Sequence, residues 1–146
     1  MSASPSATER LHATSVARDG RAVLISGPSG AGKSDLALRL IDRGFTLVSD
    51  DQTILELADG RLLASAPSNI SGKLEIRGIG IVDMTYVDAV PVSLLVVLTN
   101  EINRLPNDEN SVREVLGVAL PSVSVDPVTA SAAAKVVIAL DRMGLR

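Results

Sequence analysis

The sequence contains no cysteine and no tryptophan, and its 146 residues include one tyrosine, one phenylalanine and one histidine. The lack of cysteine excludes disulfide bonds and thiolate metal sites, and it is compatible with a reducing cytosol. Because aromatic residues make up only 1% of the chain, we expect the hydrophobic core to be built from Val, Leu, Ile and Ala side chains.

Long apolar stretches and an excess of positive charge are also missing. No apolar run approaches the ~20 residues of a membrane span, so we expect no membrane contact. The net charge is -3 and the pI is about 5.1. These values, and the lack of a nucleic-acid-binding motif, argue against a nucleic-acid partner. Residues 1–8 are rich in Ser, Ala and Pro without an apolar signal-peptide core, which indicates a disordered N-terminal tail. We therefore expect a cytoplasmic protein.

Residues 9–146 are expected to form one domain. With 46% hydrophobic and 21% charged residues, a chain of this length can bury a substantial core. We find neither an internal repeat nor a second domain.

One motif organises the chain, the stretch Gly27-Pro28-Ser29-Gly30-Ala31-Gly32-Lys33-Ser34, which matches the phosphate-binding P-loop pattern G-x-x-x-x-G-K-[ST]. An apolar run precedes it and a segment with helical periodicity follows, as the motif requires. The glycines let backbone N–H groups approach a β-phosphate at a helix N-terminus. Lys33 is expected to neutralise phosphate oxygens, and Ser34 to offer a hydroxyl to Mg²⁺. A plain glycine-rich turn would need neither residue, so the motif predicts a site for ATP and Mg²⁺.

Hydrophobic periodicity and turn residues predict an α/β fold with a mixed sheet. The pair Asp19-Gly20 predicts a hairpin, which puts an antiparallel strand beside the strand that leads into the P-loop. Most P-loop enzymes begin instead with a βαβ unit. The pair Asp59-Gly60 predicts a second hairpin. The expected strands span residues 11–17, 22–26, 45–49, 54–58, 61–65 and 92–98, with a last short strand at 123–125.

Two helices are predicted. One covers residues 33–43 and ends at Gly44. The other covers residues 126–143, with Asp126 as N-cap and Pro127 as its first residue. Outside these elements we expect an extended, bent segment at 74–84 and a polar surface loop at 100–110.

Two adjacent acids are the strongest candidates for chemistry beyond the P-loop. Asp50 and Asp51 stand at the predicted end of the strand after the P-loop helix, where a carboxylate would meet the metal of a bound nucleotide. Adjacent side chains on a strand point to opposite faces, so one acid would serve Mg²⁺ and the other would take a proton. The alternative is a solvated acidic turn.

His12, Glu75 and Arg77 carry less information by themselves. A single histidine on a short strand is more often an ordinary residue than a catalytic one. Glu75 and Arg77 lie two residues apart on one face of an extended segment, where they could equally be a surface ion pair worth less than about 1 kcal/mol.

Three blocks of the sequence, in order, resemble the catalytic domain of HPr kinase/phosphorylase. They are the P-loop, then Leu47-Val48-Ser49-Asp50-Asp51, then Gly72-Lys73-Leu74-Glu75-Ile76-Arg77-Gly78-Ile79-Gly80-Ile81. Many enzymes share a P-loop, but the third block is characteristic of this family, and His12 stands where its upstream histidine would. The resemblance covers most of residues 11–84. It implies the phosphoenolpyruvate-carboxykinase-like variant of P-loop architecture, in agreement with the antiparallel start.

The resemblance also implies an activity. The family moves a phosphoryl group from a nucleotide to a regulatory serine of HPr, the phosphocarrier protein of a phosphotransferase system, and can reverse this reaction with phosphate. We therefore expect an ATP- and Mg²⁺-dependent serine kinase that acts on an HPr-like protein. The family's hexameric assembly further implies a homo-oligomer.

Site roles follow from the family pattern. Lys33 would bind phosphates, and Ser34 and Glu75 would hold Mg²⁺. Asp51 would take the serine proton, with His12 beside it. Two further expectations complete the set: Asp50 acts on the Mg²⁺ side, and Arg104, which resembles the family's late catalytic arginine, offsets charge on the transferred group.

The sequence departs from the family in two places. The family usually carries a further domain before the kinase domain, whereas only about ten residues precede Leu11 here, so the chain resembles a short form. The family's Gly-Arg-Asn segment, important for dephosphorylation, is absent from the corresponding residues 120–127. We therefore expect mainly the kinase direction.

Two other functions stay open. A small-molecule P-loop kinase of the nucleoside or shikimate type would begin with a βαβ unit and carry a basic lid, and neither is evident. A regulatory module that binds ATP without catalysis is the second alternative, against which Asp51 and Arg104 beside an intact P-loop argue.

Overall fold

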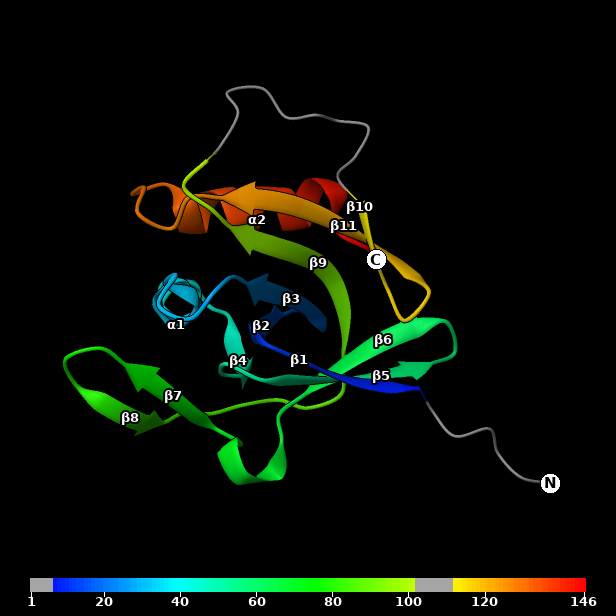
Figure 1. The fold of residues 1–146 in the computed structure, drawn as a ribbon, viewed down its shortest axis with the longest axis horizontal. Helices are drawn as coiled ribbons and strands as arrows, with labels where there is room; N and C mark the ends of the chain where they lie inside the picture. Colours follow the sequence, from blue (N-terminus) through cyan, green and yellow to red (C-terminus); the bar gives the residue numbers. More distant parts are fainter. Residues whose placement is uncertain (1–6, 102–111) are drawn as a thin grey trace.

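The chain folds into a strongly curled mixed sheet with two helices packed on it, as the computed structural model describes for residues 7–101 and 112–146 (Figure 1). The described strands are β1 Thr8–Leu11, β2 Ala13–Arg18, β3 Arg21–Ser26, β4 Thr46–Ser49, β5 Thr53–Ala58, β6 Arg61–Ser65, β7 Lys73–Ile76, β8 Gly80–Asp83, β9 Val90–Leu98, β10 Val112–Val115 and β11 Val118–Val125. The helices are α1 Lys33–Ile41, α2 Ala132–Met143 and the short 3₁₀ turn η1 Ser68–Ile70.

The sheet contains both parallel and antiparallel pairs. Its order is β1-β5-β6-β9-β3-β2-β4, with β11 beside β9 and β10 beside β11. β2 pairs antiparallel with β3, and β5 with β6, which confirms the hairpins predicted at Asp19-Gly20 and Asp59-Gly60. β3 and β11 both run parallel to β9. The carboxyl ends of β3, β9 and β11 therefore meet at one edge of the sheet (Figure 1).

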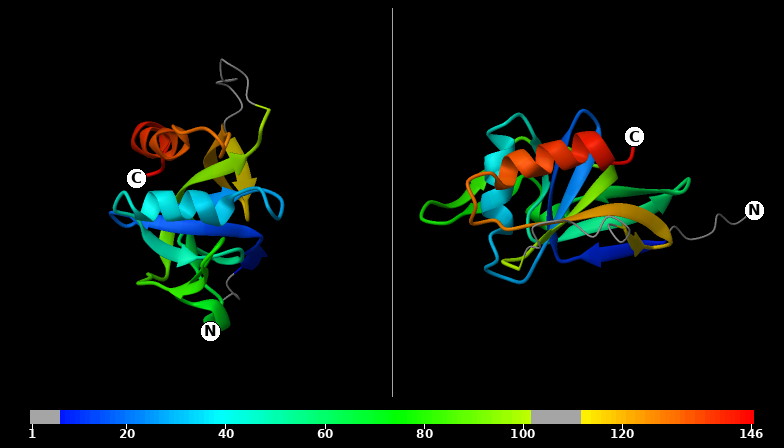
Figure 2. Two further views of the ribbon diagram at one scale, coloured as in Figure 1. Left: turned by 90° about the vertical axis from the view of Figure 1, so that its left-hand side faces the viewer. Right: turned by 90° about the horizontal axis from the view of Figure 1, so that it is seen from above.

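Side-chain alternation along the strands makes a core on both faces of the sheet. On β3, Val23 and Ile25 pack with residues of the two helices, while Ala22 and Leu24 belong to the opposite cluster. The helices cover the first face, and the curled β5–β6 hairpin closes the second (Figure 2). Apart from Phe45, the buried hydrophobic residues are Ala, Val, Leu and Ile, as the composition predicts.

The N-terminal prediction was wrong at its boundary. The tail was expected to include residues 7 and 8, but Thr8 pairs with Glu56 of β5, and the carbonyl of Ala7 accepts a hydrogen bond from Leu57 N at 2.9 Å. Residues 1–6 lie outside the described part of the chain. The strand predicted over 11–17 divides at His12 into β1 and β2, because the two halves pair with different neighbours.

Sequence reasoning missed the hairpin of β10 and β11, where it predicted only a short strand at 123–125. The two strands pair antiparallel around Leu116-Gly117, and both of these residues have positive φ, 48° and 81°. Such a turn usually contains Asn-Gly or Asp-Gly. Because Leu116 stands in place of Asn or Asp, the turn could not be recognised from the sequence.

The start of the last helix was also wrong. The structure begins α2 at Ala132, with Ser131 as N-cap. Asp126 instead closes a local turn, in which its Oδ1 accepts a hydrogen bond from Val128 N at 3.0 Å. Aspartate offers the backbone this alternative to a helix.

The segment at 74–84 contains a hairpin of β7 and β8 that turns at Gly78. Most of the loop predicted at 100–110 lies outside the described residues. Among the described helices, none has the length and apolar character needed to cross a membrane.

Candidate functional site

The P-loop connects the carboxyl end of β3 to the first residue of α1, as the sequence predicts. Gly30 and Gly32 have φ of 82° and 105°, values open to glycine with little strain, so the backbone can curve around the start of the helix. Lys33 Nζ donates hydrogen bonds to the carbonyl oxygens of Gly27 at 2.9 Å and Pro28 at 3.1 Å. Lys33 is only 6% exposed, so its side chain is nearly buried against the loop.

Asp50 joins three elements around the start of α1. Its Oδ1 accepts hydrogen bonds from Ser34 Oγ at 2.6 Å and Thr14 Oγ1 at 3.1 Å. Its Oδ2 accepts one from the backbone N–H of Glu75 at 3.0 Å. Asp50 is 8% exposed, so these bonds replace water around a nearly buried carboxylate, as a buried charge requires. Thr14, at the start of β2, is a supporting residue that sequence reasoning missed, because a threonine on a strand gives no local signal.

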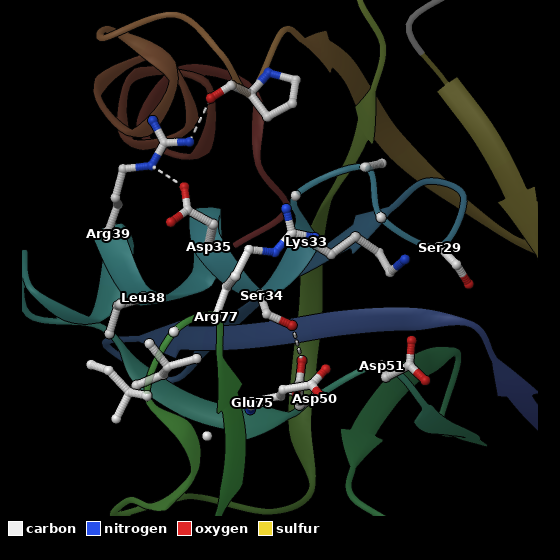
Figure 3. Close-up of a pocket in the computed structure, with 18 of the residues that line it drawn as sticks. Ser29, Lys33, Ser34, Asp35, Leu38, Arg39, Asp50, Asp51, Glu75 and Arg77 are labelled. Carbon is white, nitrogen blue, oxygen red and sulfur yellow. Dashed lines mark hydrogen bonds and ion pairs between the residues drawn. The ribbon is translucent and has the colours of Figure 1, made fainter.

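Asp51 has different surroundings although it is the next residue. The N–H of Gln52 donates to the carbonyl of Asp50 at 2.7 Å, and Asp51 between them has φ of 66°, which makes a γ-turn centred on Asp51. Thr14 Oγ1 accepts a hydrogen bond from Asp51 N at 3.1 Å. This turn points the two acidic side chains in different directions (Figure 3).

His12, the residue between β1 and β2, approaches Asp51, which lies between β4 and β5. Its Nε2 lies 2.7 Å from Asp51 Oδ1, and because a carboxylate only accepts hydrogen bonds, the imidazole N–H donates. The two side chains are 47% and 59% exposed. No donor among the described residues contacts Asp51 Oδ2.

A cleft of about 1170 Å³ runs over the P-loop and the first turns of α1, which exceeds the 300–1,000 Å³ usual for small-molecule sites. Asp50, Asp51 and Glu75 line it together with Lys33 and Ser34 (Figure 3). The structure thus brings these five predicted residues together.

The oxygen ligands in this cleft suit Mg²⁺, which takes one or two carboxylates and completes its shell with water and phosphate. Ser34 Oγ and the Asp50 carboxylate already touch, and the side chain of Glu75 lines the same cleft. The described residues hold no cluster of three or more His, Cys, Asp or Glu arranged as a metal site.

Two arginines singled out in the sequence remain, Arg77 as a possible surface partner of Glu75 and Arg104 as a predicted site residue. Arg77, at the tip of the β7–β8 hairpin, lines the same cleft. Arg104 lies outside the described residues.

Arg39 is a cleft residue that sequence reasoning missed. Its Nη2 donates to the carbonyl of Pro127 at 2.6 Å and its Nη1 to that of Thr129 at 3.3 Å, and its Nε lies 3.2 Å from Asp35 Oδ2. The Asp35 to Arg39 spacing of four residues on a helix could have suggested the ion pair. The contact with the turn after β11 depends on tertiary structure.

Comparison with known proteins gives consistent results. The family model described as "HPr Serine kinase C-terminal domain" matches residues 4–143. The HPr kinase/phosphorylase of Clostridium botulinum (strain Eklund 17B / Type B) is 47% identical over 78 residues, which are 53% of this chain and 26% of that protein. The protein of the same name from Clostridium tetani (strain Massachusetts / E88) is 48% identical over 75 residues, or 51% and 25% of the two chains. The chain thus matches about a quarter of the length of these curated relatives.

A solved structure matches nearly the whole fold. It is the structure of the Hpr(Ser) kinase/phosphatase from Coxiella burnetii, with a TM-score of 0.78, 29% sequence identity, and coverage of 91% of this chain and 94% of that one. The match confirms the predicted α/β fold with a mixed sheet.

Proposed function

Because the chain belongs to the HPr serine kinase C-terminal domain family, we propose that it transfers the γ-phosphoryl group of ATP, with Mg²⁺, to a serine of an HPr-like phosphocarrier protein. The observation that carries this proposal is the contrast between two neighbouring acids. Asp50 is nearly buried and bonded to the P-loop serine, whereas Asp51 is exposed and paired with His12. One cleft thus offers a metal-side carboxylate and a separate acceptor for a proton.

Binding would begin at the P-loop. Lys33 lies against two carbonyl oxygens of its own loop, and phosphate oxygens offer this cation a stronger partner than a neutral carbonyl. The backbone N–H groups at the start of α1 would bind the β-phosphate, aided by the helix dipole. Mg²⁺, when bound, offsets negative charge on the phosphate oxygens. Ser34, Asp50 and Glu75 are the residues that would hold it.

In the transfer itself, the acceptor serine Oγ would form a bond to the γ-phosphorus while the bond between that phosphorus and the β–γ bridging oxygen breaks, and ADP leaves with the negative charge. The serine proton would pass to the Asp51 carboxylate, whose Oδ2 accepts no hydrogen bond from the described residues. His12 would hold the other carboxylate oxygen and fix its direction. We assign Arg104 to the charge on the transferred group.

The same proposal favours the forward direction. Phosphorolysis needs a phosphate ion close to other anions, and this requires donors or cations. At the position of the family's Gly-Arg-Asn this chain has Asp126-Pro127, a carboxylate and a residue without an N–H. Asp126 precedes α2 by several residues, so the N-terminal amides of that helix do not follow it directly.

Location and assembly belong to the proposal too. We place the activity in the cytoplasm, where phosphocarrier proteins and ATP meet, and we expect an assembly of identical chains, a hexamer by family resemblance. Light scattering of the purified protein would measure the assembly.

Incubation with labelled ATP and Mg²⁺, with and without HPr, tests the proposed activity. Label on a serine of HPr supports it. Label on a small molecule from a metabolite pool would favour a small-molecule kinase. Tight ATP binding without any transfer would favour a nucleotide-sensing module.

A further inference from the structure

The cleft over the P-loop has two ends with different chemistry. At one end stand Asp50, Asp51 and Glu75. At the other end, beyond Lys33, it is lined by Leu38 and Arg39 of α1 (Figure 3). Pro127 and Val128, in the turn after β11 that Arg39 contacts, line the cleft as well. The proposed phosphoryl transfer uses only the first end.

The direction of a bound nucleotide follows from the P-loop. Its lysine reaches the β- and γ-phosphates, and the γ-phosphorus must face Asp51 for the transfer to occur. The nucleoside must then extend away from Asp51, toward Leu38 and the turn at 126–129. This turn follows β11, whose carboxyl end lies beside those of β9 and β3, and open α/β sheets bind ligands outside the carboxyl ends of parallel strands.

The turn at 126–129 is held firmly against the P-loop helix. Arg39 donates hydrogen bonds to the carbonyls of Pro127 and Thr129. Within the turn, Asp126 accepts bonds from Val128 N at 3.0 Å and, through its carbonyl, from Thr129 Oγ1 at 2.8 Å. A Cβ placed on Gly32 would lie 3.4 Å from Pro127 Cβ, so the proline packs directly on the phosphate-binding loop.

This firmly held turn nevertheless exposes apolar surface. Val128 is 87% exposed and Ile79, at the tip of the β7–β8 hairpin, is 76% exposed. They are the two most exposed large hydrophobic residues in the described part of the chain, and both line this one cleft. Exposed apolar side chains inside a cleft are typical of a ligand site.

We infer that Pro127 and Val128, with Leu38, form an apolar platform on which the base of the nucleotide rests, while Arg39 positions the turn. This inference rests on the proposed use of a nucleotide as phosphoryl donor. At this end Asp35 and Arg39 form an ion pair, and Arg39 also donates a hydrogen bond to the turn. The platform would contact the face of the base, so purine and pyrimidine triphosphates should bind with similar affinity.

Calorimetry with Mg²⁺ and four ligands, ATP, GTP, CTP and inorganic tripolyphosphate, tests this inference in the whole chain. The variant Val128→Ser removes apolar contact without adding charge. It should weaken ATP binding by about fivefold, the loss expected when one valine side chain no longer covers part of a base. Tripolyphosphate, which has no base, should bind to parent and variant with equal affinity. Val112→Ser, which changes an exposed valine of β10 outside this cleft, is the matched control and should change neither.

Each contrary outcome has a definite meaning. An unchanged ATP affinity in Val128→Ser, or an equal loss for ATP and tripolyphosphate, would overturn the platform while leaving the kinase proposal intact. A parent protein that prefers ATP over CTP by a hundredfold would overturn the face-only contact. A parent protein that binds none of the four ligands would overturn the proposed function itself, and the platform with it.

Discussion

The γ-turn at Asp51 predicts an unusual order of stability among variants. At most exposed positions alanine is more stable than glycine, by roughly 0.5–1 kcal/mol in regular structure, because glycine loses more backbone freedom on folding. At Asp51, with φ of 66°, we expect the reverse: Asp51→Gly should be more stable than Asp51→Ala.

The magnitude follows from the backbone. Both variants lose the hydrogen bond from His12 and keep the one from Asp51 N to Thr14, so these contributions cancel in the comparison. A non-glycine residue in a sparsely populated conformation costs about 1–3 kcal/mol, whereas the additional entropy cost of glycine is about 0.5–1 kcal/mol. The difference leaves Asp51→Gly ahead by about 1 kcal/mol, or about 3 °C in Tm for a domain of this size.

Urea denaturation of the two variants measures this difference as a change in the free energy of unfolding. Asp42, an exposed residue after α1 with φ of -61°, provides the control, because there alanine should be the more stable replacement. If Asp51→Ala equalled or exceeded Asp51→Gly in stability, the backbone at Asp51 would not be strained.

Three further predictions concern the site. Lys33→Ala should abolish tight binding of ATP with Mg²⁺, because the P-loop then lacks its cation; calorimetry that found the parent affinity would contradict the phosphate-binding role. Thr14→Val removes a fully buried hydroxyl that bonds both Asp50 and Asp51 N, and should lower the free energy of unfolding by about 1–3 kcal/mol. Thr14→Ser keeps the hydroxyl and loses one buried methyl group, so it should lower the free energy of unfolding less; a larger loss in Thr14→Ser than in Thr14→Val, measured by urea denaturation, would refute this. Seryl-phosphorylated HPr supplied with millimolar phosphate and Mg²⁺ should release little pyrophosphate, and release as fast as the forward transfer would disprove the kinase direction.

The parts of the fold that could be predicted are those with local signals. Asp19-Gly20 and Asp59-Gly60 adopt positive φ values, which two-residue hairpin turns require and which Asp-Gly pairs favour. The P-loop glycines and lysine form a contiguous motif. The hairpin at Leu116-Gly117 could not be predicted, because its leucine has positive φ only as a result of strand pairing. Asp126-Pro127 was a misleading signal, since the same residues begin a helix or close an isolated turn.

The candidate site, like the fold, was predictable only where the sequence carries a local signal. The sequence placed Asp50 and Asp51 beside the P-loop, but which acid is buried depends on the γ-turn and on Thr14, and both arise from the packing of β2 against the chain that follows β4. The contact of Arg39 with Pro127 joins residues 88 positions apart. No local pattern carries that information.

The central claim is that Asp51 takes the serine proton while Asp50 serves Mg²⁺, and one measurement tests it most directly. The initial rate of phosphoryl transfer from labelled ATP to HPr is followed over a series of Mg²⁺ concentrations for the parent, Asp50→Asn and Asp51→Asn. We expect Asp51→Asn to bind ATP normally and to lose about 10²–10⁴-fold in rate at every Mg²⁺ concentration. Asp50→Asn should need more Mg²⁺ and recover part of its rate when Mg²⁺ is raised. Transfer by Asp51→Asn at the parent's rate, or a Mg²⁺ requirement changed in Asp51→Asn and not in Asp50→Asn, would contradict the account.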